Sequence, residues 1–89
     1  MSTMEEVTAK MTAFARRQPL RLLADSLEQI DAKPKLDQAE RLARAVLIDV
    51  ICERCPAADA AFDAWAESDD TGPGRASAVI VTAVRATTP

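Results

Sequence analysis

The sequence predicts an all-α protein, a small compact bundle of four to five short helices. Three observations lead to this fold class. Apolar residues recur at spacings of three and four, which is the period of a helix with one buried face. Alanine, the strongest helix former, supplies about a fifth of the 89 residues, whereas the chain has one Trp, two Phe and no Tyr. Two Gly and five Pro argue against a β fold with many turns.

The length of the chain, 89 residues, allows one domain over 1–89, with residues 86–89 expected as a disordered tail. A chain this short buries only ~60–65 % of its unfolded surface, and alanine side chains add little area to a core. The core is therefore expected to be thin. A second copy could complete the burial, so we expect a homo-oligomer.

The first two helices are expected at residues 4–17 and 19–31. Ser2 and Thr3 precede Glu5 and Glu6 at the spacing of a capping box, and Pro19 suits the first turn of the second helix. The apolar stripes of the two helices are Met4, Val7, Met11 and Phe14, and then Leu20, Leu23, Leu27 and Ile30.

The third helix is expected at residues 37–54 and is apolar on two sides. Asp37 and Glu40 predict a reciprocal cap at its start, and Pro56 disfavours helix at Cys55. One stripe consists of Ala39, Leu42, Ala43, Val46, Leu47 and Val50, and the opposite side carries Ala45, Ile48 and Cys52. A helix that is apolar all round must be covered all round. It is therefore either the centre of the bundle or half of a dimer interface, with Ala45, Ile48 and Cys52 as candidate self-association residues.

The fourth helix is expected to start at Pro56, with a stripe of Ala58, Ala61, Phe62 and Trp65. A Gly- and Pro-containing loop follows at residues 68–74. Residues 77–85 fit either a helix or a strand, because they combine a helical stripe with a β-branched run. Helix is preferred, since a lone strand is not stable. A strand paired with its copy in a dimer is the alternative.

Charge is distributed unevenly along the chain. Residues 10–44 carry eight basic and five acidic side chains, whereas residues 45–74 carry one basic and seven acidic side chains. Such polarity can steer a head-to-tail contact or a partner, although solvated helix faces of uneven sign are the preferred explanation. The candidate surface for a protein partner is the acidic fourth helix, with Asp59, Asp63 and Glu67, together with the loop at 68–74.

Cys52 and Cys55 form a C-x-x-C pattern, which in other settings binds metal or exchanges a disulfide. Here the pair lies at the expected C-terminus of a helix, where the dipole disfavours a thiolate. The chain has no His and no further Cys to complete a zinc site. We expect inert cysteines; a metal shared across a dimer and redox chemistry are the alternatives.

Catalysis is not predicted. The chain has no His, the side chain most used for proton transfer near neutral pH, and no glycine-rich phosphate loop. Its paired carboxylates lie at ordinary helical spacing. We therefore expect no catalytic residue, no cofactor and no metal.

A helix-turn-helix DNA-binding regulator is the alternative function. The helices at 19–31 and 37–54 are joined by a short break, and basic residues gather around it. Arg41 and Arg44 would face a DNA groove. The acidic composition of the chain argues against nucleic acid as the partner.

The stretch around the third and fourth helices has a recognisable order. An acidic cap and Ala39-Glu40-Arg41 lead into an apolar helix, then a Pro break, then an acidic helix with Trp65. In this order it resembles small uncharacterised helical proteins of high-GC actinobacteria and of their phages. The resemblance implies an accessory protein that binds a host protein, and it implies no functional residue.

Neither a signal peptide nor a membrane span is predicted. The first residues are polar and acidic, and no apolar run approaches the ~18 residues that a span needs. We expect a cytoplasmic protein that works through protein–protein contacts.

Overall fold

The computed structural model describes residues 3–67 and 73–87, and over these ranges the chain is all-α, as the sequence predicts. The helices are α1 (Met4–Arg16), α2 (Leu20–Asp31), α3 (Gln38–Arg54), α4 (Pro56–Glu67) and α5 (Pro73–Thr87). Residues 77–85 lie within α5, so the helical reading of this segment is confirmed and the strand alternative is wrong. None of these five helices combines the length and apolar character that crossing a membrane requires.

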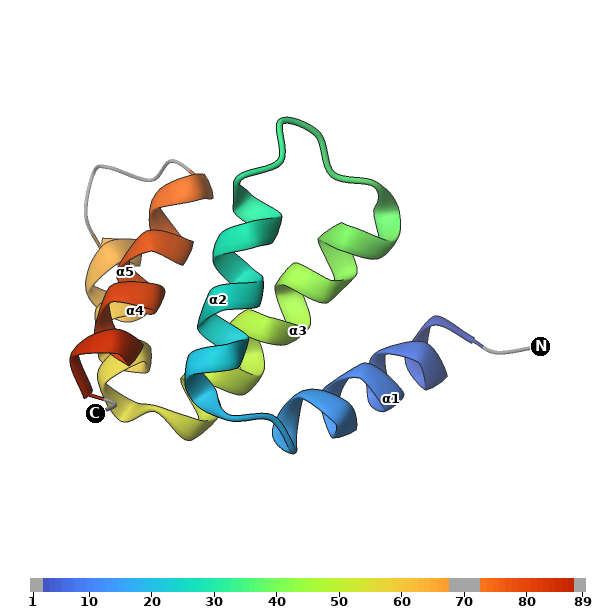
Figure 1. Cartoon of the computed structure of the whole chain (residues 1–89), viewed down its shortest axis with the longest axis horizontal. Coiled ribbons are helices and arrows are strands. Elements are labelled where there is room, and N and C mark those ends of the chain that lie inside the picture. The colour runs from blue at the N-terminus through green and yellow to red at the C-terminus, as the bar shows by residue number, and fades with distance from the viewer. Residues whose placement is uncertain (1–2, 68–72, 88–89) are drawn as a thin grey trace.

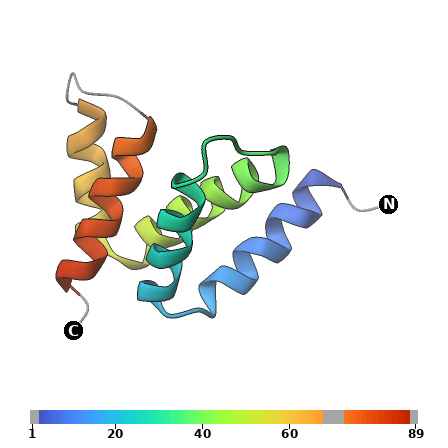
Figure 2. The same ribbon diagram turned by 45° about the horizontal axis from the view of Figure 1, so that its top comes forward.

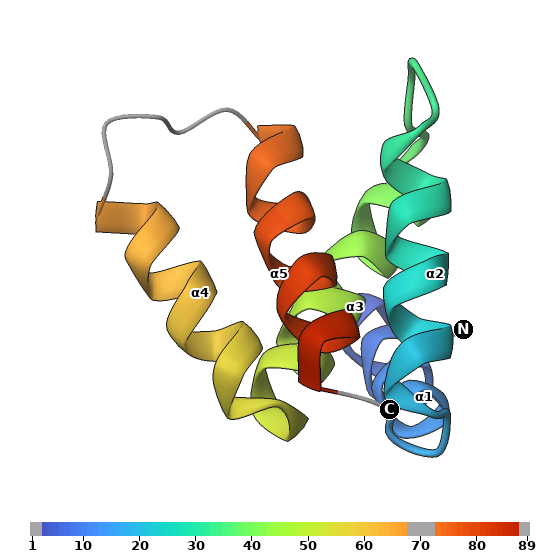
Figure 3. The same ribbon diagram turned by 60° about the vertical axis from the view of Figure 1, so that its left-hand side comes forward.

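Helix α3 is the centre of the bundle, one of the two positions expected for it, because it contacts each of the other four helices. Helices α4 and α5 form an antiparallel pair that α2 and α3 flank (Figures 2 and 3). Helix α1 packs on α3 and extends toward the opposite end of the molecule from α4 and α5 (Figure 1). The bundle covers the side of α3 that carries Val46, Leu47 and Val50, whereas on the opposite side Ala45 is exposed and Ile48 and Cys52 are half-buried.

The core is supplied unequally by the five helices. Its largest fully buried side chains are Leu27 of α2, Val50 and Ile51 of α3, and Ile80 and Val84 of α5. Helix α1 contributes one fully buried residue, Ala15, and α4 contributes Ala58. Helices α1 and α4 therefore supply little of the buried core, although α4 packs extensively on α5.

The starts of α1 and α3 follow the expected capping chemistry, whereas α2 begins at Leu20, one residue later than expected, with Pro19 extended at its N-cap. The Thr3 hydroxyl accepts the Glu6 N–H at 3.1 Å. The Asp37 carboxylate accepts the Glu40 N–H at 2.8 Å, and the Asp37 N–H donates to the Glu40 carboxylate at 3.2 Å. The reciprocal cap predicted for α3 is thus present.

The last helix is longer than expected at both ends. It begins at Pro73, so residues 73 and 74 belong to α5 rather than to the loop, because a proline suits the first helical position. It also includes residues 86 and 87 of the expected tail, where the Thr87 hydroxyl donates to the Ala83 carbonyl at 3.0 Å. Residues 68–72 and 88–89 lie outside the described part of the chain. At the other end of the molecule, α1 stops at Arg16, one residue early.

Candidate functional site

Helices α3 and α4 diverge from a sharp corner. Cys55 is the one non-helical residue between them; its backbone is extended, as expected before Pro56. Its N–H donates to the Ile51 carbonyl at 2.8 Å, and its carbonyl accepts the Asp59 N–H at 3.1 Å. The end of α3 and the start of α4 are therefore both hydrogen-bonded at this residue, and the two helices spread apart away from it.

A continuous depression runs between these helices, and we call it the α3–α4 groove. One part is a hollow of about 400 Å³ lined by Arg44, Ala45, Ile48, Asp49, Phe62, Trp65 and Ala76. The other is a hollow of about 490 Å³ lined by Ile48, Asp49, Cys52, Glu53, Asp59, Phe62 and Asp63. The hollows share Ile48, Asp49 and Phe62, so they form one groove.

The floor of the groove is apolar. Ile48, Cys52 and Phe62 are half-buried and pack against the core, so each still presents part of its surface. The rings of Phe62 and Trp65 lie 5.8 Å apart between centroids at an interplanar angle of 37°. This tilted pair forms the α4 side of the groove. Its geometry is one that aromatic pairs favour at this distance.

The rim of the groove is acidic. Asp49 and Glu53 of α3 and Asp59 and Asp63 of α4 are all exposed along it. Glu53 is neutralised by Arg16, whose guanidinium makes two hydrogen bonds of 3.1 Å to the carboxylate. Asp49, Asp59 and Asp63 form no ion pair with any residue that the structure describes. Three uncompensated carboxylates therefore surround an apolar floor.

The thiol of Cys52 responds to this environment. Burial raises the pKa of Cys52 to about 11, and the neighbouring carboxylates of Asp59, Asp49 and Asp63 add to the increase. Burial and negative charge act in the same direction, because both disfavour the thiolate. The Cys52 thiol is therefore kept neutral and belongs to the apolar floor of the groove.

At the end away from Cys55, the groove is bordered by a hydrogen-bonded network centred on Arg44, which we call the polar clamp. The Arg44 guanidinium donates to the Asp31 carboxylate at 2.8 Å and to the Ser77 hydroxyl at 2.7 Å. Ser77 is 2 % exposed, and the Arg44 and Asp31 side chains are about one-fifth exposed. This network ties α2, α3 and α5 together and holds the α3 side of the groove in place.

The structure brings together two sets of residues that the sequence analysis treated as separate sites. Asp59 and Asp63, expected to bind a partner, stand on the rim, while Ala45, Ile48 and Cys52, expected to mediate self-association, line the groove. Glu67 is exposed on α4 but lines neither hollow.

Sequence reasoning missed part of this lining. Phe62 and Trp65 were assigned only to a core stripe, and Asp49 and Glu53 were not singled out at all. The sequence does hold a signal for Asp49 and Glu53. They are four residues apart on α3 and follow Ala45 at the same spacing, so all three share one side of the helix.

The two cysteines lie in different surroundings. Cys52 lines the groove, whereas Cys55 is buried with its sulfur 3.6 Å from the Thr87 hydroxyl. Both are free thiols. Among the described residues, His, Cys, Asp and Glu side chains nowhere gather in a group of three that could hold a metal ion.

The two arginines that DNA binding requires are also placed differently. Arg41 is exposed, whereas Arg44 is engaged with Asp31 and Ser77. Lys33, in the connection between α2 and α3, forms an ion pair with Glu40. Much of the basic charge expected around this connection is therefore used within the chain.

The fold and the groove together define a small helical bundle with one acidic-rimmed apolar groove. Comparison of the chain with protein-family models, with curated proteins and with solved structures gave no match.

Proposed function

We propose that this protein acts in the cytoplasm by binding another protein through the α3–α4 groove. The observation that carries the proposal is the half-exposed apolar floor beside Asp49, Asp59 and Asp63, whose carboxylates form no ion pair within the described part of the chain. A buried apolar anchor supplies most of the affinity in an interface, and charges at the rim mainly set partner choice and the rate of encounter. The groove offers both features.

The partner segment that fits is a basic amphipathic helix. Its apolar side chains, spaced three or four residues apart, would cover Ile48, Cys52 and Phe62. Its Lys or Arg side chains would lie against the carboxylates of the rim. In line with the resemblance of the sequence, we place the protein among accessory proteins of bacterial or phage origin that modulate a host protein.

The test compares one groove variant with a control of equal charge. Asp63→Lys reverses a rim charge, and Glu5→Lys makes the same change on α1, far from the groove. A protein retained from a cell lysate by the wild type is identified, purified and titrated against all three forms. We expect slower association with Asp63→Lys, unchanged association with the Glu5→Lys control, and a wild-type rate that falls as salt rises. Equal association rates for the three forms would remove the groove from the interaction.

DNA binding by α2 and α3 is less well supported, because Arg44 already has protein partners. Enrichment of a defined duplex sequence by the wild type, lost in Arg41→Ala, would favour that function instead.

A further inference from the structure

Helix α1 carries an exposed stripe of four residues, whose first member, Val7, also lines a hollow with the start of α3. The stripe is Val7, Lys10, Phe14 and Arg17, whose spacing of three and four residues places them along one edge of the helix. Val7 is 36 % exposed and Phe14 is 66 % exposed, the highest value among the large apolar side chains that the structure describes. Apolar and basic residues alternate along this edge.

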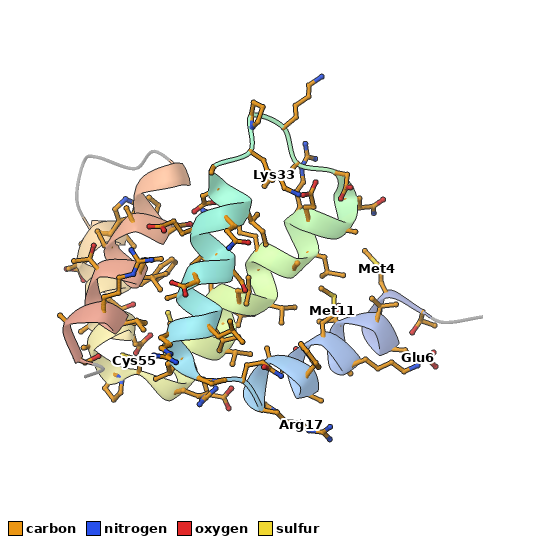
Figure 4. All side chains as sticks on the ribbon, viewed as in Figure 1. Met4, Glu6, Met11, Arg17, Lys33 and Cys55 are labelled. Atoms are coloured by element: carbon orange, nitrogen blue, oxygen red, sulfur yellow. The ribbon has the colours of Figure 1, made fainter. Side chains whose placement is uncertain are left out.

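The side of α1 that packs on the bundle is a different one. Ala15 is buried and Met11 packs against the core. In Figure 4, Met4 and Met11 lie on the side that faces α3, whereas Arg17 points away from the bundle. Val7 borders α3 through a hollow that it shares with Leu42, so the part of the edge from Lys10 to Arg17 is available to another molecule.

The two basic residues of this stripe are also unpaired. Lys10 and Arg17 form no ion pair with any described residue, in contrast to Arg16, which binds Glu53. Two unpaired cations flank an exposed aromatic ring on α1. Three unpaired carboxylates surround an apolar floor between α3 and α4. The two surfaces match in both charge and hydrophobicity.

We propose that a second copy of this chain places its α1 stripe in the α3–α4 groove. The inference rests on the proposed function only in taking the groove to be a protein-binding surface. Phe14 supplies the apolar anchor against Ile48 and Phe62, and Lys10 and Arg17 meet the acidic rim. The pair is closed when a two-fold axis relates the two copies, since each copy then places its stripe in the groove of the other.

A charge-swap experiment tests this contact. The stripe variant is Lys10→Glu/Arg17→Glu, and the groove variant is Asp59→Lys/Asp63→Lys. In each variant the stripe and the groove carry the same sign, so we expect self-association on the order of tenfold weaker than in the wild type. When the two variants are mixed, every stripe again faces a groove of opposite sign. The mixture is expected to recover the mass of the wild-type pair in sedimentation velocity measurements.

A matched control separates this contact from a general effect of charge. Arg21→Glu/Lys35→Glu makes the same change at exposed basic residues outside the stripe and should associate like the wild type. Circular dichroism of all variants should remain that of the wild type, because exposed charges contribute little to folding. A wild type that stays monomeric at millimolar concentration, or a mixture that does not recover the pair, would overturn the proposal.

The failure of this inference and that of the proposed function give different results. If the wild type is monomeric but Asp63→Lys still slows the binding of a retained partner, self-association is refuted and the proposed function stands. If the charge swap succeeds while Asp63→Lys leaves the partner's association unchanged, the groove serves the second copy only.

Discussion

Cys52 is a reporter of the electrostatic potential in the α3–α4 groove, and its rate of alkylation tests the site without a partner. Only the thiolate reacts with iodoacetamide, so the rate follows the thiolate fraction. Burial and the carboxylates of Asp59 and Asp49 raise the pKa of Cys52 from 9.0 to about 11. At pH about 8, this change lowers the thiolate fraction from about 10 % to about 0.1 %. We therefore expect folded Cys52 to react about 100-fold more slowly than the same residue in the unfolded chain.

The assay distinguishes the two thiols without any substitution. Trypsin cleaves after Arg54 and releases Cys52 in the peptide 45–54 and Cys55 in the peptide 55–75. Protein is treated with iodoacetamide for increasing times in buffer and in urea, and the labelled fraction of each peptide is measured by mass spectrometry. The ratio of the two rates for Cys52 gives the effect of folding on its reactivity.

Neutral substitutions then separate the contribution of charge from that of burial. Asp59→Asn and Asp63→Asn should each increase the rate of Cys52 alkylation, because each removes a charge that disfavours the thiolate. Glu5→Gln, the control on α1, should leave the rate unchanged. A folded Cys52 that reacts as fast as the unfolded chain at pH about 8, or a rate unaffected by Asp59→Asn and Asp63→Asn, would refute the acidic groove.

The same pKa shift sets a pH dependence of stability. Because the pKa of Cys52 is higher in the folded state, folding favours the neutral thiol. This contribution is fully present below pH 9.0 and is lost as the pH rises from 9.0 to about 11. The urea midpoint of the wild type should therefore fall over this window more than that of Cys52→Ala.

Three further predictions concern stability, and each is measured by thermal unfolding, in which 1 kcal/mol corresponds to about 4–8 °C in a chain of this size. Arg44→Ala should cost about 1–3 kcal/mol because it leaves the partly buried Asp31 without its cation, whereas the exposed Arg41→Ala should change the melting temperature little. Equal effects of the two would contradict the clamp. Asp37→Ala removes the capping box and should cost about 1 kcal/mol. Ile51→Ala, at a fully buried site between helices, should cost about 2–5 kcal/mol.

The fold could be predicted from the sequence because its main determinants are local. Helical spacing, the Asp37 cap and the corner at Pro56 each act over a few residues, and all three are observed. The secondary structure of residues 77–85 was harder to predict from the sequence. Residues 77–85 have β-branched side chains that suit either structure, and packing of this segment on α4 and α2 decides for a helix that buries Ile80 and Val84. Propensity alone could not settle that competition.

The site could be predicted only in pieces. Ala45, Ile48 and Cys52 were found by their position on α3, and Asp59 and Asp63 by their charge on α4. Their meeting depends on the angle at which α3 and α4 diverge, which the periodicity of either helix does not encode. Arg44 shows the same limit. Its position on α3 suggested an outward cation, but its partners, Asp31 and Ser77, lie 13 and 33 residues away in the sequence.

The groove follows from the unequal sides of α4. Helix α4 packs extensively on α5, and on that side the small side chain of Ala61 lines a second hollow with Val79 and Ala83. The large rings of Phe62 and Trp65 lie on the side of α3 and hold that helix at a distance. Because α4 has small side chains on one side and large rings on the other, it cannot pack equally closely against α5 and α3. The thin core expected from so many alanines thus leaves its gap beside the aromatic residues of α4, where the acidic residues of α3 and α4 also lie.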